Sequence, residues 1–300
     1  MVISPASSLR PRRSLLTVPA INLRALEKCR LLDCDGVIFD LEDSVAVDQK
    51  PEARLNLERL FAEARLTNKE TIIRINGLDS PFLTDDLALV EKLSPDAVLV
   101  PKVERPDDLV RVQQALDAGT AATGPRLWAM METARGVLNV AAIAESRPAA
   151  DRLDVFVIGL NDLRKETRVM PRPGRVYLVP YLMQVILAAR ANGLDVIDSV
   201  FNDFRDKDGF AEECRQGREM GFDGKMLIHP AQIDPANQAF GPLPEALADA
   251  AAIVSAFARP ESAGQNVINL NGRMVERLHL EEAERLLSLA KSLKDRKTDT

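Results

Sequence analysis

Eight short apolar runs divide most of the chain, and a longer amphipathic stretch follows each of them. The runs are almost continuously apolar, which is typical of strands buried on both faces of a parallel sheet. Their spacing of about 25–35 residues suits βα units. Eight such units predict a closed (β/α)8 TIM barrel. The runs comprise residues 14–19, 36–41, 71–76, 97–103, 126–131, 155–159, 194–200 and 224–228.

An open, doubly wound sheet is the alternative arrangement of the same units. Such a sheet usually carries a glycine-rich phosphate-binding turn after its first strand. Residues 18–22 (VPAIN), at the end of the first run, contain no glycine. Gly224-Lys225 does not form a P-loop either, because Met226 follows and the preceding glycine spacing is wrong. The sequence therefore favours the barrel.

The alternation stops after Pro230, and only helical patterns follow. Residues 244–258 and 274–293 each have the apolar spacing of an amphipathic helix, and a polar stretch at 262–266 links them. We expect residues 1–235 to form a catalytic barrel domain. We expect residues 236–300 to form a C-terminal helical extension that packs on a neighbouring subunit.

Composition excludes several classes of protein. The 39 Lys and Arg residues against 45 Asp and Glu give a net charge of −6, which argues against nucleic acid as the main partner. No apolar run is long enough for a transmembrane helix, and the N-terminus lacks the apolar segment of a secretory signal. Three cysteines and two histidines are too few for a disulfide framework or a zinc site. We expect a cytoplasmic protein without a membrane partner, in which any metal is bound by oxygen.

Polar side chains follow the apolar runs where the strands of a barrel would end. Barrel enzymes carry their active sites at the carboxyl ends of the strands. Burying such groups without partners is costly, so we expect them to bind each other, a metal or a ligand. They are Asp40-Leu41-Glu42-Asp43, Arg74 with Asn76, Lys102, Glu132 with Thr133, Asn161-Asp162 and His229.

Glu132 and Asp162 end neighbouring strands, so both carboxylates can point into one mouth of the barrel. Two carboxylates, waters and a chelating substrate would complete the oxygen shell that Mg²⁺ prefers. In the alternative, each carboxylate caps a helix or pairs with Arg74 or Lys102. These two cations either hold a substrate carboxylate or enolate oxygen, or they form ion pairs with the acids that end the second run.

Other conspicuous residues have simpler interpretations. A structural role is favoured for the lone His229 over a general base. Trp128 lies inside the fifth run and is expected in the core. Residues 164–175 carry five Arg or Lys residues and one acid. This segment is expected to be a solvated loop, with contact to a phosphate-bearing ligand as the alternative.

Several of these segments form an ordered set of motifs between residue 13 and about residue 240. The set comprises Arg13-Ser14-Leu15-Leu16 with Pro19, Asp40-Leu41-Glu42-Asp43-Ser44-Val45 with Lys50 and Arg54, Arg74-Ile75-Asn76, Pro101-Lys102-Val103-Glu104, Glu132-Thr133-Ala134-Arg135-Gly136, Gly159-Leu160-Asn161-Asp162-Leu163, and Gly224-Lys225 with Ile228-His229-Pro230-Ala231-Gln232. Each motif alone is weak, but their order is specific. Together they resemble the citrate lyase β-subunit-like proteins, CoA-ester lyases of the HpcH/HpaI aldolase superfamily.

The resemblance implies a (β/α)8 barrel that is commonly a homotrimer. It implies Mg²⁺-dependent carbon–carbon cleavage of a 3-hydroxyacyl-CoA, such as citramalyl-, malyl- or citryl-CoA, to acetyl-CoA and a keto acid. The CoA ester is then the expected partner. In this family the residues that match Glu132 and Asp162 bind Mg²⁺, and the residue that matches Arg74 contacts the substrate. Glu132 is therefore expected at both the metal and the substrate.

The resemblance also suggests roles for the remaining motif residues. With Arg74, we expect Glu42 and Asp43 in the catalytic set, as carboxylates that orient other groups or relay a proton. Arg13 and Lys102 are expected to bind the CoA or carboxylate end of the substrate.

Different functions within the superfamily are compatible with the same motifs. Relatives that also hydrolyse the thioester carry an Asp in a C-terminal motif, where this chain has Glu276, with Leu278 in place of the motif's proline. We therefore favour simple lyase chemistry over an acyl-CoA thioesterase. A pyruvate-type aldolase that acts on free hydroxy-ketoacids is also compatible with the motifs, and so is a non-catalytic barrel that binds a CoA ester or metabolite.

Overall fold

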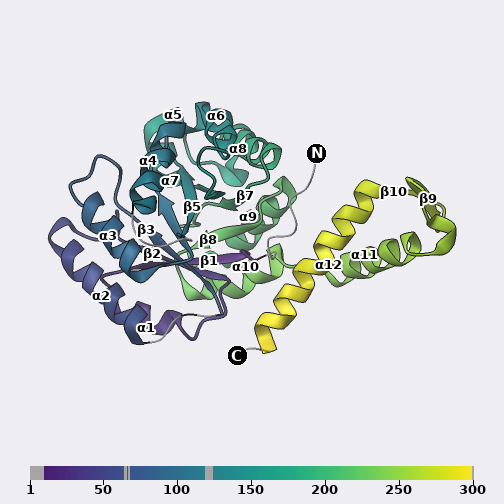
Figure 1. The fold of residues 1–300 in the computed structure, drawn as a ribbon, viewed down its shortest axis with the longest axis horizontal. Helices are drawn as coiled ribbons and strands as arrows, with labels where there is room; N and C mark the ends of the chain where they lie inside the picture. The colour runs from purple at the N-terminus through teal and green to yellow at the C-terminus, as the bar shows by residue number, and fades with distance from the viewer. Residues whose placement is uncertain (1–9, 64–65, 67, 119–123, 299–300) are drawn as a thin grey trace. The chain divides into compact units, whose positions relative to one another are not determined.

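The computed structural model describes residues 10–63, 66, 68–118 and 124–298 (Figure 1). Arg12–Phe240 is one compact unit, and the residues from Gly241 onward belong to a second. The division predicted between residues 235 and 236 falls inside helix α10 (Ile233–Phe240). Within the described ranges, no helix is both long enough and apolar enough to span a bilayer.

Eight parallel strands close a barrel in the first unit, which confirms the predicted fold class. Each strand pairs with the next one in the chain, and the last pairs back onto the first. The strands are β1 (Ser14–Pro19), β2 (Gly36–Asp40), β3 (Glu70–Arg74), β4 (Ala97–Val100), β5 (Arg126–Met131), β6 (Leu153–Ile158), β7 (Asp195–Asp198) and β8 (Gly224–Leu227).

Helices surround the barrel and cover its outer face (Figure 1). Strand residues such as Leu16 and Val18 pack with helix residues such as Leu26 in one large buried cluster. The helices of this unit are α1 (Leu23–Cys29), α2 (Lys50–Glu63), α3 (Leu83–Leu93), α4 (Pro106–Asp117), α5 (Ala134–Leu138), α6 (Val140–Glu145), α7 (Leu160–Thr167), α8 (Val179–Ala191), α9 (Lys207–Met220) and α10.

A second buried cluster fills the interior of the barrel. It contains Leu15, Ile38, Ile72 and the fully buried Trp128, as expected for a core tryptophan. Side chains alternate between the two faces of a strand. The next inward-facing positions after this apolar layer are therefore occupied by the polar residues that end the strands, and this periodicity brings them together at one mouth.

Arg12 closes the opposite end of the barrel. Its guanidinium lies 5.1 Å from the centre of the Trp128 ring. It donates to Glu70 at the start of β3 at 2.9 Å, to Asp154 in β6 at 2.7 Å and to Asp195 at the start of β7 at 2.7 Å. One buried cation thus holds together the amino ends of three strands.

The second unit contains the two predicted C-terminal helices and, between them, a β-hairpin that the helical patterns do not predict. Antiparallel strands β9 (Val267–Leu270) and β10 (Arg273–Glu276) lie between α11 (Pro244–Phe257) and α12 (Arg277–Thr298). Asn271 and Gly272 connect the strands with φ of 54° and 82°. Such left-handed conformations suit an Asn-Gly turn. The hairpin takes residues 274–276, which the apolar spacing assigns to the last helix.

Replacing Arg12 by Met is expected to lower the free energy of unfolding by about 3–5 kcal/mol, because it removes the buried cation that pairs with the buried Glu70 and with the half-buried Asp154 and Asp195. Urea denaturation measures this loss. Arg126→Met is the control, since Arg126 makes a half-exposed ion pair with Asp154 at 3.4 Å. Its loss should cost less than about 1 kcal/mol. Equal effects of the two substitutions would contradict the assigned role of Arg12.

Candidate active site

A cavity of about 400 Å³ opens at the carboxyl ends of the barrel strands. Residues from all eight strands, or from the turns that follow them, line it. Its polar wall includes Asp40, Arg74, Glu132, Asp162 and Ser199. Its volume is suited to a small-molecule ligand.

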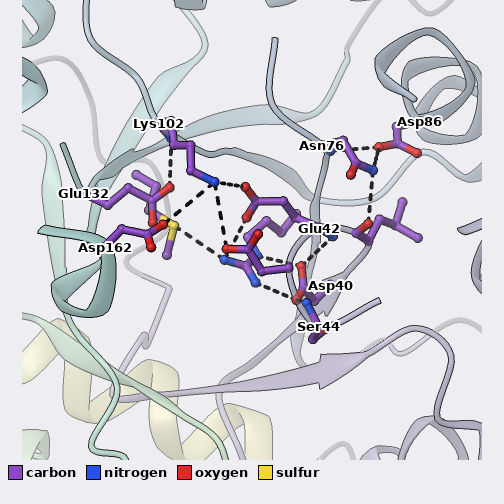
Figure 2. Close-up of polar contacts among 12 residues, drawn as sticks. Asp40, Glu42, Ser44, Asn76, Asp86, Lys102, Glu132 and Asp162 are labelled. Atoms are coloured by element: carbon purple, nitrogen blue, oxygen red, sulfur yellow. Dashed lines mark hydrogen bonds and ion pairs between the residues drawn. The ribbon is translucent and has the colours of Figure 1, made fainter. Parts of the chain in front are cut away.

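A buried ion pair between β2 and β3 fixes the position of Arg74. The Asp40 carboxylate accepts from Arg74 Nε at 2.6 Å and from Nη2 at 2.5 Å (Figure 2). It also accepts from the backbone N–H groups of Glu42 and Ser44. Burial acts to raise the pKa of Asp40, but the hydrogen bonds and charge of Arg74 lower it below its ordinary value. Asp40 therefore stays ionised and holds the guanidinium in one orientation.

Glu42 connects Arg74 with Lys102. Its Oε2 lies 3.1 Å from Arg74 Nη1, and its Oε1 accepts from Lys102 Nζ at 2.6 Å. Burial raises the pKa of Glu42 against the opposing effect of these two cations. Lys102 Nζ also lies 3.9 Å from Asp43 and 3.8 Å from Asp162. Arg74 and Lys102 therefore do form the ion pairs with the acids after the second run.

Glu132 and Asp162 approach each other from neighbouring elements. Glu132 follows β5 and is buried, and its Oε1 accepts from the backbone N–H of Lys102 at 2.9 Å. Asp162 lies in the first turn of α7 and lines the same cavity. Figure 2 shows the two carboxylates near each other. Burial first, and then the negative charges of Glu42 and Asp162, raise the pKa of Glu132 to about 8.

The donors at Glu132 and Asp162 fit a magnesium ion. Both offer carboxylate oxygens, which Mg²⁺ prefers, and Mg²⁺ typically takes one or two carboxylates and completes its shell with water and substrate. Among the described residues, no group of three or more His, Cys, Asp or Glu side chains is arranged to hold a metal. Burial first, and then the nearby carboxylates, disfavour the ionised form of Glu132, and a divalent cation would offset this effect on its pKa.

Gly159 allows β6 to pass close to Glu132. A Cβ atom built on Gly159 would lie 2.5 Å from both Cβ and Oε2 of Glu132. Any larger residue would therefore push the Glu132 carboxylate out of its position. The glycine that precedes α7 thus helps to shape the space between the two carboxylates.

The structure brings most of the predicted site residues together. Asp43 lines the cavity with Arg74, Glu132 and Asp162. Glu42 and Lys102 contact these lining residues through ion pairs, Glu42 with Arg74 and Lys102 with Asp162. Asn76 donates to Leu41 O and to Asp86, which ties the turns after β2 and β3 together.

Arg13 does not join this cluster. It lies at the beginning of β1, and its guanidinium pairs with Asp35 at 2.8 Å. The cavity is at the other end of that strand, where Pro19 lines it. The predicted contact of Arg13 with the CoA or carboxylate end therefore has no support in the geometry.

The basic segment 164–175 is not a continuous solvated loop, in contrast to the prediction. Its first residues belong to α7, which ends at Thr167. Arg175 is buried and donates to Asp198 at 2.6 Å. His229 has a structural environment, because its Nδ1 accepts from the N–H of Ala231 and its ring stacks on Phe204 with centres 4.5 Å apart.

Sequence reasoning missed the polar residues that end β7. Asp198 and Ser199 follow an apolar run as the other site residues do, and Ser199 lines the cavity. The rule that selected the ends of the other strands would have selected them too. The buried partner of Asp198, Arg175, carries no comparable local signal.

Replacing Gly159 by Ala is expected to weaken Mg²⁺ binding about tenfold or more, because the added methyl group displaces Glu132. Titration calorimetry of the purified protein measures the affinity. Gly77→Ala is the matched control, since a Cβ atom there would meet nothing within 4 Å. Unchanged Mg²⁺ affinity in Gly159→Ala would argue against this role of the glycine.

Comparisons with known proteins agree with this arrangement. Residues 13–230 match the family described as HpcH/HpaI aldolase/citrate lyase. A (3S)-malyl-CoA thioesterase of Cereibacter sphaeroides is 44% identical over 290 residues, covering 96% of this chain and 98% of that protein. The mitochondrial citramalyl-CoA lyase of Homo sapiens is 30% identical, covering 95% of this chain and 87% of that protein. The structure of CitE from Mycobacterium tuberculosis in complex with magnesium, acetoacetate and coenzyme A has a TM-score of 0.73 and 30% identity, covering 93% of this chain and 97% of that one. The chain therefore belongs to the HpcH/HpaI aldolase/citrate lyase family.

Proposed function

We propose that the protein is a Mg²⁺-dependent carbon–carbon lyase that cleaves malyl-CoA or citramalyl-CoA to acetyl-CoA and a keto acid. The observation that carries the proposal is a guanidinium, Arg74, fixed at a cavity that also holds the paired carboxylates of Glu132 and Asp162. The names of relatives support the substrate class, since they include a malyl-CoA thioesterase and a citramalyl-CoA lyase. A homotrimeric assembly stays a prediction.

Cleavage of such a substrate breaks the bond between the α and β carbons of the acyl chain. The β-hydroxyl loses its proton, its C–O bond becomes the carbonyl of the keto acid, and the electron pair of the broken bond passes to the α carbon. The resulting acetyl-CoA enolate is then protonated. Bound Mg²⁺ would supply Lewis acidity that lowers the pKa of the hydroxyl. Glu132 and Asp162 are the residues that would hold the ion.

Arg74 is placed to stabilise the enolate oxygen. Its position is set before substrate arrives, because Asp40 binds two of its nitrogens and Glu42 a third. A cation that needs no reorganisation during the reaction stabilises developing negative charge most effectively.

The three acidic residues at the end of β2 and just after it have different roles in the proposed reaction. Asp40 has a lowered pKa and is saturated with donors, so it is a poor proton acceptor. Glu42 reaches the cavity only through Arg74 and Lys102, and we assign it a positioning role. Asp43 lines the cavity and is exposed, which makes it the better candidate to exchange a proton with the substrate.

Hydrolysis of the thioester is the second candidate function. It is favoured by the 44% identity with the malyl-CoA thioesterase over nearly the whole chain. Glu276, the residue that weighed against hydrolysis in the sequence, ends β10 in the second unit. The two functions share the substrate, the metal and the residues that hold them, and they differ in the bond that breaks.

Incubation of the protein with malyl-CoA and Mg²⁺ is expected to yield acetyl-CoA and glyoxylate, identified by mass spectrometry. EDTA and Glu132→Gln should each abolish the reaction, because both remove the proposed ion. Malate with free CoA, detected by a thiol reagent, would instead establish the thioesterase. Tight binding without turnover of malyl-, citramalyl- or citryl-CoA would identify a non-catalytic barrel, and cleavage that needs no CoA would identify an aldolase.

Replacing Arg74 by Met is expected to lower kcat about 10²–10³-fold, the cost of losing a preorganised donor at an oxyanion. The substitution also leaves Asp40 buried without its partner, which destabilises the fold. The double variant Asp40→Asn with Arg74→Met removes that carboxylate charge. It should recover stability in thermal melts without recovering kcat. If the double variant regained wild-type kcat, the role of Arg74 in stabilising charge would be refuted.

A further inference from the structure

Helix α7, which carries Asp162, is attached through its first residue to Ser199 after β7, and the segment that follows the helix is attached to Asp198 in β7. We propose that Ser199 and the buried Arg175–Asp198 pair position α7, and thereby set the separation between Asp162 and Glu132 that a divalent ion requires. This inference rests on the proposed function, because it assigns a task to residues outside the metal site. Arg175, Asp198 and Ser199 themselves lie outside the motifs that resemble the family.

Ser199 holds the first turn of α7. Its Oγ accepts from the backbone N–H of Leu160, the first residue of the helix, at 3.0 Å. The N–H of Ser199 itself donates to Asp198 Oδ1 at 2.8 Å. Asp162 lies in the same first turn, so its carboxylate moves with the Leu160 amide. A shift of the β7 end would therefore be transmitted to Asp162.

The segment after α7 also contacts Asp198, through the side chain of Arg175. After the helix, Arg168 adopts a left-handed conformation with φ of 59°, and the chain turns back to Arg175, which also has a positive φ of 53°. Arg175 Nη1 donates to Asp198 Oδ1 at 2.6 Å, and its Nε donates to Gln216 at 2.9 Å. The left-handed Arg168 ends α7, and the buried pair with Asp198 fixes the chain again at Arg175.

Asp198 is itself held rigidly. It is fully buried, and its Oδ2 accepts from Lys225 Nζ at 2.9 Å. Lys225 Nζ also donates to Glu213 Oε1 at 2.8 Å. On the same side, a Cβ atom on Gly217 would lie 2.9 Å from Asp198 Oδ2, so α9 packs directly on the carboxylate. Buried ion networks add little net stability. We therefore infer that this network serves to fix the position of the Asp198 carboxylate.

A third attachment joins α7 to the other half of the metal site. Glu166, one turn beyond Asp162, accepts from the backbone N–H of Ala134 at 3.0 Å. Ala134 begins α5, two residues after Glu132. Helix α7 therefore spans from the Glu132 turn to the end of β7. Without the bond to Ser199, the contact of Glu166 with Ala134, the hydrogen bond from Asn202 to Asn161 and the 3.8 Å pair of Asp162 with Lys102 remain, and we expect these to hold Asp162 less precisely.

The test is the Mg²⁺ affinity of the whole protein without substrate, measured by titration calorimetry. Ser199→Ala and Arg175→Met should each raise the Kd for Mg²⁺ about tenfold or more, as substitutions behind metal ligands do. Arg175→Lys, which keeps a cation for Asp198, should recover part of the affinity. Arg12→Met is the matched control, because it breaks a buried arginine network at the opposite end of the barrel. It should lower the melting temperature and leave the Kd unchanged.

The outcomes separate this inference from the proposed function. Wild-type Kd values in both Ser199→Ala and Arg175→Met would overturn the positioning role and leave the lyase proposal standing. A rise in Kd in Arg12→Met equal to that in Arg175→Met would also overturn it, since the effect would then follow stability alone. A wild-type protein that binds no Mg²⁺ would overturn both the proposed function and this inference.

Discussion

An excess of negative charge at one mouth of the barrel is the constraint on which the site depends. Asp40, Glu42, Glu132 and Asp162 converge there, and Arg74 and Lys102 are their cations. Arg74 forms ion pairs with Asp40 and Glu42, and the carboxylate closest to Lys102 Nζ is that of Glu42. Glu132 accepts from the backbone N–H of Lys102, and Asp162 lies 3.8 Å from Lys102 Nζ. Burial, together with the charges of Glu42 and Asp162, raises the pKa of Glu132. A divalent cation held by Glu132 and Asp162, as we propose, would offset part of the negative charge at this mouth.

The two ends of the barrel use buried arginines differently. At the amino ends of the strands, Arg12 pairs with three carboxylates, and its guanidinium packs against the Trp128 ring. At the carboxyl ends, Arg74 is bound on one side and faces the cavity on the other. This division matches the general separation of stability and chemistry between the two faces of such barrels.

Most of the barrel and the centre of the site follow from local sequence patterns. The apolar runs predict the strands. The polar residues that follow them, such as Arg74, Glu132 and Asp162, predict the cavity at the carboxyl ends of the strands. Arg13 directly precedes β1 and pairs with Asp35, so the strand-end pattern does not include it, and its contact with the substrate stays a prediction from the resemblance. The β9–β10 hairpin was missed although Asn271-Gly272 is a hairpin signal. The Arg175–Asp198 pair joins segments distant in the chain, and no periodicity in either segment encodes it.

The central claim is that one divalent ion bridges Glu132 and Asp162. The most direct measurement is a crystal structure of the protein soaked with Mn²⁺, in which anomalous scattering locates the metal independently of any activity. The account predicts a single strong peak within coordination distance of a carboxylate oxygen from each residue. A fully occupied ion elsewhere in the cavity, or a cavity in which Lys102 alone pairs with these carboxylates at saturating Mn²⁺, would contradict it.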